Sequence, residues 1–270
     1  MRRAAGISVL FALFAAAPGV VLAADNLDLV TVPSGTFVMG DAHGDANEAP
    51  RKAEVQSFHI MRYEVTNRQF AAFVIETGYR TDAGKIGSGF VWDGRWRRIA
   101  GAGWQTPHGP DSTIKGRQNH PVVQVSARDA EAFCSYHGLR LPTEVEWEFA
   151  ARGKDGRRYP WGDPPPRQGI LPARANFGTV ACCALSTEDG FGKTAPVGNY
   201  PAGASPFGLH DLAGNVWEWT ATTFPGKPDE RAIRGGGWGN NPYCLRVSYR
   251  HGNPPQISLD MVGFRCANSL

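Results

Sequence analysis

Long stretches rich in Gly, Pro, Asn and Asp separate the short patterned segments of this sequence, and they limit its fold more than any other feature. The longest cover residues 82–120, 160–206 and 224–231, and the chain holds 33 glycines and 20 prolines among its 270 residues. Loops of this length are uncommon in a compact domain and are usually functional or held by metals and disulfides. No shift in composition and no internal repeat marks a boundary. We therefore expect residues 24–270 to form a single loop-rich domain.

Three short helices are predicted between these stretches. Capping boxes begin at Thr66 and Thr143, and Ser126 is suited to cap a third helix with Asp129 in its first turn. Apolar residues with helical spacing follow each start, and a glycine suited to end a helix comes after them, at positions 78, 153 and 138.

Short strands are predicted from runs of β-branched and aromatic residues bounded by turn residues. The best candidates cover residues 29–32, 36–39, 55–60, 122–125, 216–219, 232–235 and 262–266.

Charge and composition exclude several classes of protein. Lys and Arg total 28 against 25 Asp and Glu, a formal charge of +3. Removing Arg2 and Arg3 with a leader leaves 26 against 25, or +1, which argues against binding nucleic acid or an anionic membrane through bulk charge. With 42% hydrophobic and 20% charged residues, the chain is typical neither of a disordered nor of a membrane-embedded protein.

Residues 1–23 are typical of a secretory signal peptide. Arg2 and Arg3 precede an apolar core at residues 7–17, and Ala23 ends a small-residue cleavage site. The alternative is a membrane anchor, but the core is broken at Pro18 and is too short to span a bilayer. No later segment is predicted to cross a membrane. We expect an exported protein, periplasmic or extracellular, in a compartment where disulfides persist.

Eleven motifs in order along the mature chain resemble the formylglycine-generating enzyme (sulfatase-modifying factor) family. They include Tyr63-Glu64-Val65-Thr66-Asn67 and Gly214-Asn215-Val216-Trp217-Glu218-Trp219. All eleven lie at residues 32–40, 63–67, 109–113, 120–122, 140–144, 146–148, 160–162, 188–191, 214–219, 234–236 and 263–265. The resemblance implies an α+β fold of the C-type-lectin-like kind, loop-rich and with little regular secondary structure.

The resemblance also implies two structural calcium ions. By motif, the predicted ligands are Asn176, the Phe177 carbonyl, Asp189 and the Phe191 carbonyl for the first ion, and Asp211, Asn215 and Glu218 for the second. The chemistry agrees, because calcium takes several oxygens from carboxylates, amides and backbone on irregular loops. The alternative is that these Asn and Asp residues only shape turns.

Five cysteines are present. Cys134 and Cys266 match a pair that is disulfide-bonded in the animal members, so the resemblance predicts that bond; two free buried thiols are the alternative, which an oxidising compartment disfavours. Cys182 and Cys183 are adjacent. A vicinal disulfide, a bond from one of them to Cys244, and metal ligation all stay open for this pair.

The segment 234–244 carries the resemblance to the catalytic strip. The family's oxidases use two cysteines there to bind Cu(I), and with O2 they oxidise a substrate cysteine to formylglycine. Cys244 matches the second cysteine and Tyr243 the residue before it, whereas Asn240 best matches the first cysteine and Gly237 replaces a serine. Two soft thiolates suit Cu(I), so one thiolate beside an amide is a poor copper site. Copper at Cys244 is therefore a doubtful expectation.

Other residues are predicted to form the substrate cleft. Trp217 matches the cleft floor, and Cys244, Tyr243 and Trp217 form the predicted catalytic set. Polar candidates for substrate binding are Asp111, Ser112, Arg246 and Arg250, which could equally be satisfied loop and surface residues. Some relatives bind non-haem iron, but the seven histidines show no spacing that would supply two ligands to one ion.

The sequence thus supports competing functions. The first is an O2-dependent oxidoreductase that acts on a cysteine-containing protein, such as a sulfatase, or on a peptide-derived substrate. The second is a non-catalytic, calcium-stabilised binding module on the same scaffold, because a fold alone does not give a function. A siderophore-maturation oxidase is a narrower third possibility.

Overall fold

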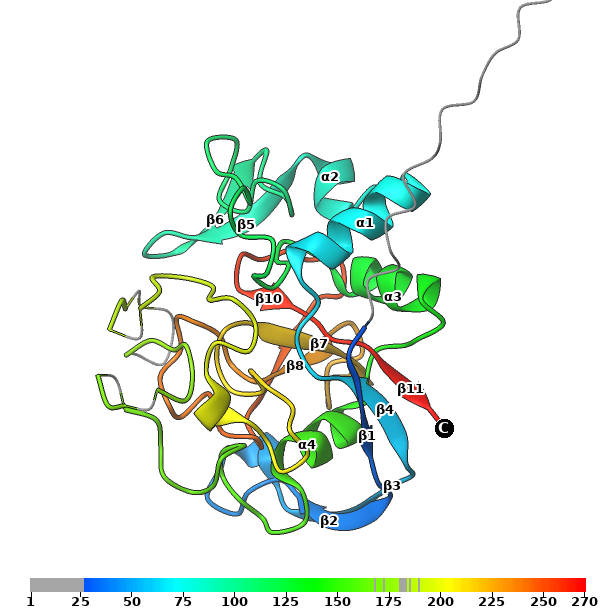
Figure 1. The fold of residues 1–270 in the computed structure, drawn as a ribbon, viewed down its shortest axis with the longest axis vertical. Coiled ribbons are helices and arrows are strands. Elements are labelled where there is room, and N and C mark those ends of the chain that lie inside the picture. Colours follow the sequence, from blue (N-terminus) through cyan, green and yellow to red (C-terminus); the bar gives the residue numbers. More distant parts are fainter. Residues whose placement is uncertain (1–26, 168, 172, 180–183, 185, 189) are drawn as a thin grey trace, which may run out of the picture.

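The structure is a computed structural model that describes residues 27–270 apart from 168, 172, 180–183, 185 and 189. It is a mixed fold of short helices and many short strands (Figure 1). The helices are α1 (Asn67–Thr77), α2 (Asp82–Ile86), α3 (Ala127–Tyr136) and α4 (Glu144–Arg152). The strands are β1 (Leu29–Val32), β2 (Gly35–Met39), β3 (Arg51–Val55), β4 (Phe58–Met61), β5 (Ser88–Trp92), β6 (Trp96–Ala100), β7 (Trp217–Thr223), β8 (Arg231–Arg234), β9 (Arg250–Asn253), β10 (Val262–Gly263) and β11 (Ala267–Ser269).

The three predicted helices are confirmed, together with their caps. At α1 the Thr66 side chain accepts from the Gln69 backbone N–H, and the Gln69 side chain accepts from the Thr66 N–H, so two otherwise unpaired donors are satisfied. Gly78 ends this helix at a φ of 66°, a conformation that glycine adopts without the cost other residues meet. Ser126 and Thr143 start α3 and α4 with the same kind of box.

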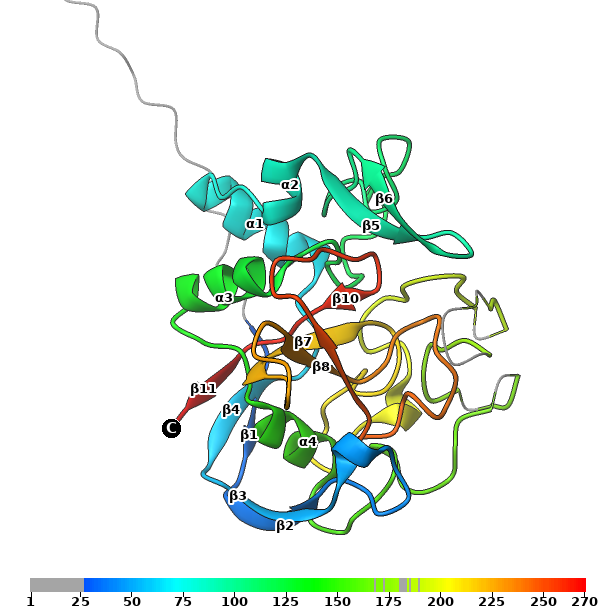
Figure 2. The same ribbon diagram turned by 180° about the vertical axis from the view of Figure 1, so that it is seen from behind.

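Two sheets organise the interior. The first has the order β10-β7-β8-β9, in which β10 runs parallel to β7 and the other pairs are antiparallel. The second has the order β1-β4-β11, so the first and last strands both flank β4. In both views β7 and β8 lie centrally, with α1, α2 and the β5–β6 hairpin at one end and α4 with β2 and β3 at the other (Figures 1 and 2).

Parts of the strand prediction are wrong. Residues 55–60 form no single strand, because β3 ends at Val55 and β4 starts at Phe58. Residues 122–125 form no strand, because Gln124 has a φ of 60° and its side chain donates to the carbonyls of Phe90 and Pro107. Of the segment 262–266 only Val262 and Gly263 form a strand, β10, and β11 begins just after the segment at Ala267.

The stretch 82–120, predicted to be one long loop, contains α2 and the β5–β6 hairpin. Thr81 caps α2 by accepting from the Gly84 N–H, and Gly87 ends it after barely more than one turn. Such a short helix carries no apolar periodicity that a sequence pattern could reveal. The hairpin that follows pairs Trp92 with Trp96 at its tip.

The predicted disulfide is confirmed: Cys134 of α3 is bonded to Cys266, 132 residues further along. Both residues are buried in a core that α1 and α3 build against β7. A second core lies between α4 and the strands β2, β3 and β4. No helix in the described ranges has the length and apolar character needed to cross a membrane.

Candidate functional site

The turn that follows β8 builds one wall of the site. Asn240, which the motif match predicts to replace the family's first cysteine, is buried, and its amide oxygen accepts from the Trp217 indole N–H at 2.9 Å and from the Gly237 N–H at 3.0 Å. A side chain at Gly237 would put its Cβ 2.5 Å from Met261 Cγ, so the serine predicted from the family match would require the Met261 side chain to shift. The residues at this turn therefore hold one another in place.

Cys244 lies four residues further on. It is buried, only 3% exposed, and the hydroxyl of Tyr249 donates a hydrogen bond to its sulfur. Burial raises the pKa of the Cys244 thiol, while the Tyr249 hydrogen bond acts in the opposite direction by favouring the thiolate. The same pairing, together with burial, raises the pKa of Tyr249.

These residues do not fit a two-thiolate copper centre. Asn240 offers an amide whose oxygen is already shared between Trp217 and Gly237, and Cys244 is held toward its neutral form. Cu(I) prefers soft thiolate ligands, and a protonated thiol or an amide is a poor substitute. We therefore assign no reaction step to copper.

Cys244 and Trp217 share the wall of a cavity of about 140 Å³. The cavity brings together residues from β7, β8, β9, β10 and the tip of the β5–β6 hairpin. Its lining residues are Trp96, Trp217, Ile233, Asn240, Cys244, Tyr249, His251, Asn253, Leu259, Met261 and Val262.

Tyr243, predicted with Cys244 as a catalytic residue, is not part of the lining. Its ring is 43% exposed, and its hydroxyl donates to Asp45 Oδ1 at 2.7 Å. The guanidinium of Arg246 lies 4.0 Å from the centre of the ring. Tyr243 therefore belongs to the outer face of this segment, and its catalytic role stays a prediction.

The four polar residues predicted to bind substrate are not brought together at this cavity. Arg246 is buried and forms two 2.9 Å hydrogen bonds with the Glu48 carboxylate, and Arg250 is ion-paired with Glu144. Asp111 is exposed, and Ser112 closes its own turn by donating to the Gly109 carbonyl at 2.7 Å. The two arginines thus have structural partners, and substrate binding by any of the four stays a prediction.

A cluster of charged side chains lies in the interior near β7. Arg265 is fully buried and donates to both carboxylate oxygens of Glu218 at 2.7 Å, while the Trp147 indole donates to Glu218 at 2.8 Å. Burial alone would lower the pKa of Arg265, but the Glu218 carboxylate outweighs it and raises that pKa. Burial raises the pKa of Asp211 to about 6.

Glu64 completes this cluster. It accepts from the Asn215 side-chain N–H at 2.6 Å and from the Val216 backbone N–H at 3.2 Å. Burial, and then the neighbouring carboxylates of Asp211 and Glu218, raise the pKa of Glu64 well above its usual range. Three carboxyl groups therefore share one buried guanidinium.

The predicted calcium ligands can be tested against this geometry. Asn176 is buried, its amide nitrogen donates to the Lys193 carbonyl at 2.7 Å, and its Oδ1 has no hydrogen-bond partner among the described residues. An unpaired buried oxygen is costly unless something binds it, so Asn176 fits a cation ligand. Asp189, predicted beside it, lies outside the described residues; Phe177 is buried and Phe191 is half-buried.

The second predicted calcium set has other partners. Asp211 accepts from the Gly198 N–H at 2.6 Å, the Asn215 oxygen accepts from the Ala195 N–H at 2.9 Å, and Glu218 is paired with Arg265. Within the described ranges, no three His, Cys, Asp or Glu side chains are placed to hold a metal ion. Calcium at this set stays a prediction.

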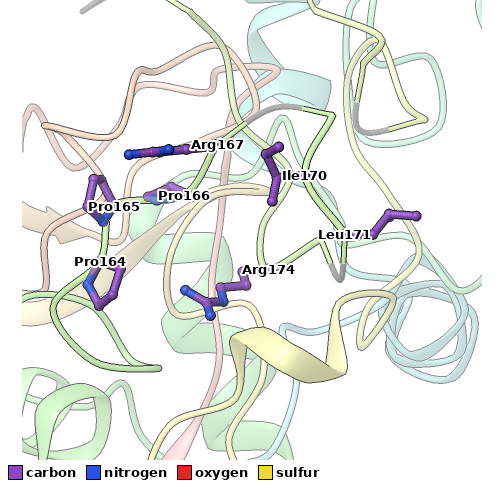
Figure 3. A pocket seen from close by; sticks show the side chains of 7 residues that line it. All are labelled: Pro164, Pro165, Pro166, Arg167, Ile170, Leu171 and Arg174. Carbon is purple, nitrogen blue, oxygen red and sulfur yellow. The ribbon is translucent and has the colours of Figure 1, made fainter.

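A second pocket lies on the proline-rich segment after residue 160 (Figure 3). Pro164 and Pro165 lie on one side and Leu171 on the other, with Arg174 between them. The described residues that line it include no acid, thiol or histidine. This pocket therefore offers no group for acid–base or redox chemistry, and the Cys244 cavity is the better candidate site.

Comparison with known proteins agrees with the motifs. A family model described as "Sulfatase-modifying factor enzyme 1-like domain" matches residues 19–270. The chain belongs to the formylglycine-generating enzyme family. It is 40% identical to the mouse inactive C-alpha-formylglycine-generating enzyme 2, over 89% of this chain and 85% of that protein. It is also 40% identical to the formylglycine-generating enzyme of Streptomyces coelicolor, over 88% of each chain.

A solved structure of the same family confirms the fold. PvdO from Pseudomonas aeruginosa superposes with a TM-score of 0.69 at 26% identity, covering 90% of this chain and 94% of that one. The predicted α+β fold of the formylglycine-generating enzyme family is therefore correct. Members with and without activity are among the relatives, so the family assignment alone leaves the activity of this chain open.

Sequence reasoning gave no role in this site to several lining residues, among them Tyr249, His251, Asn253 and Trp96. Tyr249 is five residues after Cys244, a spacing that no regular secondary structure would place in contact, so no periodic signal was available. His251 was considered only as a possible metal ligand. Trp96 lies in a hairpin that was predicted to be loop, although a Trp at a polar turn was a signal that something apolar faces it.

Proposed function

We propose that this protein is an exported oxidoreductase of the formylglycine-generating enzyme family that uses O2 to oxidise a cysteine-containing protein or a peptide-derived substrate in the Cys244 cavity. The observation that carries the proposal is a buried thiol on a cavity wall, hydrogen-bonded to a tyrosine and beside Trp217. Apolar burial by itself leaves a thiol inert, so the proposal depends on the Tyr249 hydrogen bond, which favours the thiolate, and on the place of the thiol in a cavity wall.

The residues around Cys244 can divide the work. Tyr249 donates to the sulfur and so stabilises the thiolate when the thiol loses its proton. Trp217, fixed by its indole hydrogen bond to Asn240, offers a rigid face against which a substrate group can lie. The largely apolar lining keeps water from the thiol.

The test is oxygen uptake by the mature protein with a Cys-x-Pro-x-Arg peptide, with the peptide product followed by mass spectrometry. We expect Cys244→Ser to abolish turnover and Tyr249→Phe to lower it by about tenfold or more, because a hydrogen bond to a charged group contributes about 1.5–3 kcal/mol. Tyr136→Phe, which removes a hydroxyl on the far surface, serves as the matched control. Equal turnover in Cys244→Ser and the unmodified protein would refute the proposal.

A binding module without chemistry is the second candidate, and the bonds of Asn240 favour it. An amide locked between Trp217 and Gly237 preserves the cavity while replacing one of two catalytic thiols. Such a module would bind its ligand equally well in Cys244→Ser and would show no oxygen uptake. A Cu(I) competition titration adds a separate test. Tight, stoichiometric Cu(I) binding that is lost in Cys244→Ser would support a copper-dependent oxidase after all.

We also propose that calcium stabilises the loops around Asn176. The unpaired Asn176 oxygen supports this, since a bound cation would satisfy it. Adding calcium to chelator-treated protein should raise the melting temperature, and Asn176→Ala should remove most of that increase. Asn67→Ala is a useful control, because Asn67 also has an unpaired buried oxygen but lies outside the predicted ligand sets.

Export is proposed from residues 1–23. N-terminal sequencing of protein recovered from the periplasm or the medium should begin at Ala24. Recovery of the intact N-terminus from the cytoplasm would contradict both the cleavage and the export.

A further inference from the structure

The described lining of the Cys244 cavity contains no Asp, Glu, Lys or Arg. Its three titratable groups are all held toward their neutral forms: burial raises the pKa values of Cys244 and Tyr249 and, although part of the ring is exposed, dehydration lowers that of His251. A charged group entering the cavity would lose its hydration without meeting a counter-charge, which is costly. The part of a ligand that enters is therefore uncharged.

Aromatic faces dominate the walls. The Trp217 ring lies 5.9 Å from Tyr249 and 6.1 Å from His251, measured between ring centroids, with the planes tilted by 46° and 49°. Aromatic rings favour further rings at such distances, in offset or edge-to-face contact. Trp96 adds a fourth ring from the β5–β6 hairpin.

The cavity has the size of a single ring. Its volume is about 140 Å³, and an engineered apolar cavity of about 150 Å³ is known to bind benzene. A fused two-ring system or a folded stretch of peptide would need more room. Aliphatic side chains, such as Leu259 and Met261, complete the walls and suit the rim of a planar group.

One polar side chain in the cavity is uncommitted. Asn253 is half-buried and forms no side-chain hydrogen bond within the described part of the chain. The Asn240 oxygen and the Tyr249 hydroxyl, in contrast, already have partners. An amide of this kind can donate to or accept from a hydroxyl on a ring, which favours a phenol over a plain hydrocarbon.

We propose that the group which enters the Cys244 cavity is a single uncharged aromatic ring bearing a hydroxyl, carried on a peptide or peptide-derived substrate. The proposal rests on the proposed function in that it takes this cavity as the substrate site. It narrows the peptide-derived alternative of that function to substrates that carry a phenolic ring.

Trp96 gives the proposal a variant that can be expected to fold. Its side chain is 36% exposed at the tip of a two-stranded hairpin, so its removal leaves the buried cores intact. Arg97 on the same strand is the matched control, because its side chain is exposed, pairs only with Asp93 in a surface ion pair and does not line the cavity.

The experiment measures binding of p-cresol to the protein by calorimetry or ligand-observed NMR, with two competitors. 4-Methylcyclohexanol matches the size of p-cresol but is not aromatic, and N-acetylcysteine amide represents a substrate cysteine. We expect p-cresol to bind more tightly than either. Trp96→Ala should weaken p-cresol binding about three- to tenfold, the range of one lost aromatic contact. The unmodified protein should bind p-cresol more tightly than toluene, which lacks the hydroxyl, and Asn253→Ala should remove that difference. Arg97→Ala should leave binding unchanged.

The outcomes separate this inference from the proposed function. Equal binding of p-cresol and 4-methylcyclohexanol, or displacement of p-cresol by N-acetylcysteine amide at lower concentration, would overturn the aromatic assignment, whatever the oxygen-uptake assay gives. Selective p-cresol binding that depends on Trp96 would support it even where no turnover is seen, in which case only the oxidoreductase proposal fails.

Discussion

The interior around Arg265 and the cavity around Cys244 lie on either side of the same central strands but use opposite chemistry. The interior buries a guanidinium among three carboxyl groups, with Glu218 paired to Arg265 through both oxygens. The cavity is lined, as far as it is described, by aromatic, aliphatic and neutral polar side chains. Charged side chains thus pair with one another in the interior, whereas the described lining of the cavity contains none.

Arg246 is another buried charge, close to the cavity but outside its described lining. On one side it binds Glu48 through two hydrogen bonds, and on the other its guanidinium lies 4.0 Å from the ring of Tyr243 and 5.7 Å from that of Tyr249. Burial alone would lower the pKa of Arg246, but the bond to Glu48 keeps it raised, so the charge persists. One ring of the cavity, that of Tyr249, thus lies beside a charge that does not line the cavity.

Replacing Arg265 should have the largest effect on the charged interior, measured as a loss of unfolding free energy. Arg265→Met leaves Glu218 buried without its partner and removes bonds to the carbonyls of Met61, Arg62 and His210. Breaking a buried ion pair costs about 3–5 kcal/mol, and we expect the upper end for the free energy of unfolding in denaturant. Arg62→Met, which breaks an exposed pair with Asp28, should cost under about 1 kcal/mol. Similar losses in both variants would contradict the argument.

Removing the disulfide tests whether the interior also depends on a covalent closure. Alanine at both Cys134 and Cys266 opens a loop of 132 residues. For loops of this order the chain-entropy model gives about 4 kcal/mol or slightly more, measured as unfolding free energy under non-reducing conditions. Adding reductant should destabilise the unmodified protein but leave the double variant nearly unaffected. A double variant as stable as its parent would show that packing alone closes the core.

Arg246→Met tests how a buried charge close to the cavity affects both the stability of the protein and the Cys244 thiol. The lost pair with Glu48 should reduce the unfolding free energy by about 3 kcal/mol. The charge of Arg246 also lowers the pKa of Cys244, and that of Glu48 raises it, so the thiol should become less reactive in the variant. Alkylation of Cys244 and urea unfolding of the same sample would measure both effects. If Cys244 is alkylated at the same rate in a less stable Arg246→Met variant, the charge of Arg246 does not act on the thiol.

The smallest effect concerns the thiol itself. Because burial raises the pKa of Cys244, its thiolate fraction at a given pH is lower than that of an unfolded thiol, and the rise of its alkylation rate should shift to higher pH. Tyr249→Phe removes the hydrogen bond that favours the thiolate and should shift the profile further. Mass mapping of the iodoacetamide-labelled peptide between neutral and alkaline pH gives the profile. A shift to lower pH in Tyr249→Phe would contradict the assigned hydrogen bond.

The sequence predicted the parts of the fold that local chemistry decides. The caps at Thr66, Ser126 and Thr143 specify where helices start, because a side chain and a backbone group within one turn satisfy each other. Residues 122–125 look like a strand, yet Gln124 takes its conformation from bonds to the carbonyls of Phe90 and Pro107. Tertiary partners of this kind leave no periodic pattern.

The candidate site was predictable only in part. Cys244 and Trp217 were found through motifs and do share one cavity. Arg246 was predicted to bind substrate at the same site. The sequence does not distinguish a buried, ion-paired arginine from one that faces a cleft, and only the contact of Arg246 with Glu48, 198 residues away, shows which it is. The Tyr249 hydrogen bond and the position of Trp96 likewise depend on how loops return, which the motifs do not record.

The pairing of β11 with β4 determines when this protein can fold. Arg265, Cys266 and β11 all belong to the last six residues, while β1 and β4 lie near the other end of the chain. A growing chain that has not reached these residues lacks the guanidinium, the thiol and the strand that complete its interior. The interior can therefore close only after residues 265–269 have been made, because until then β4 lacks one of its two neighbouring strands.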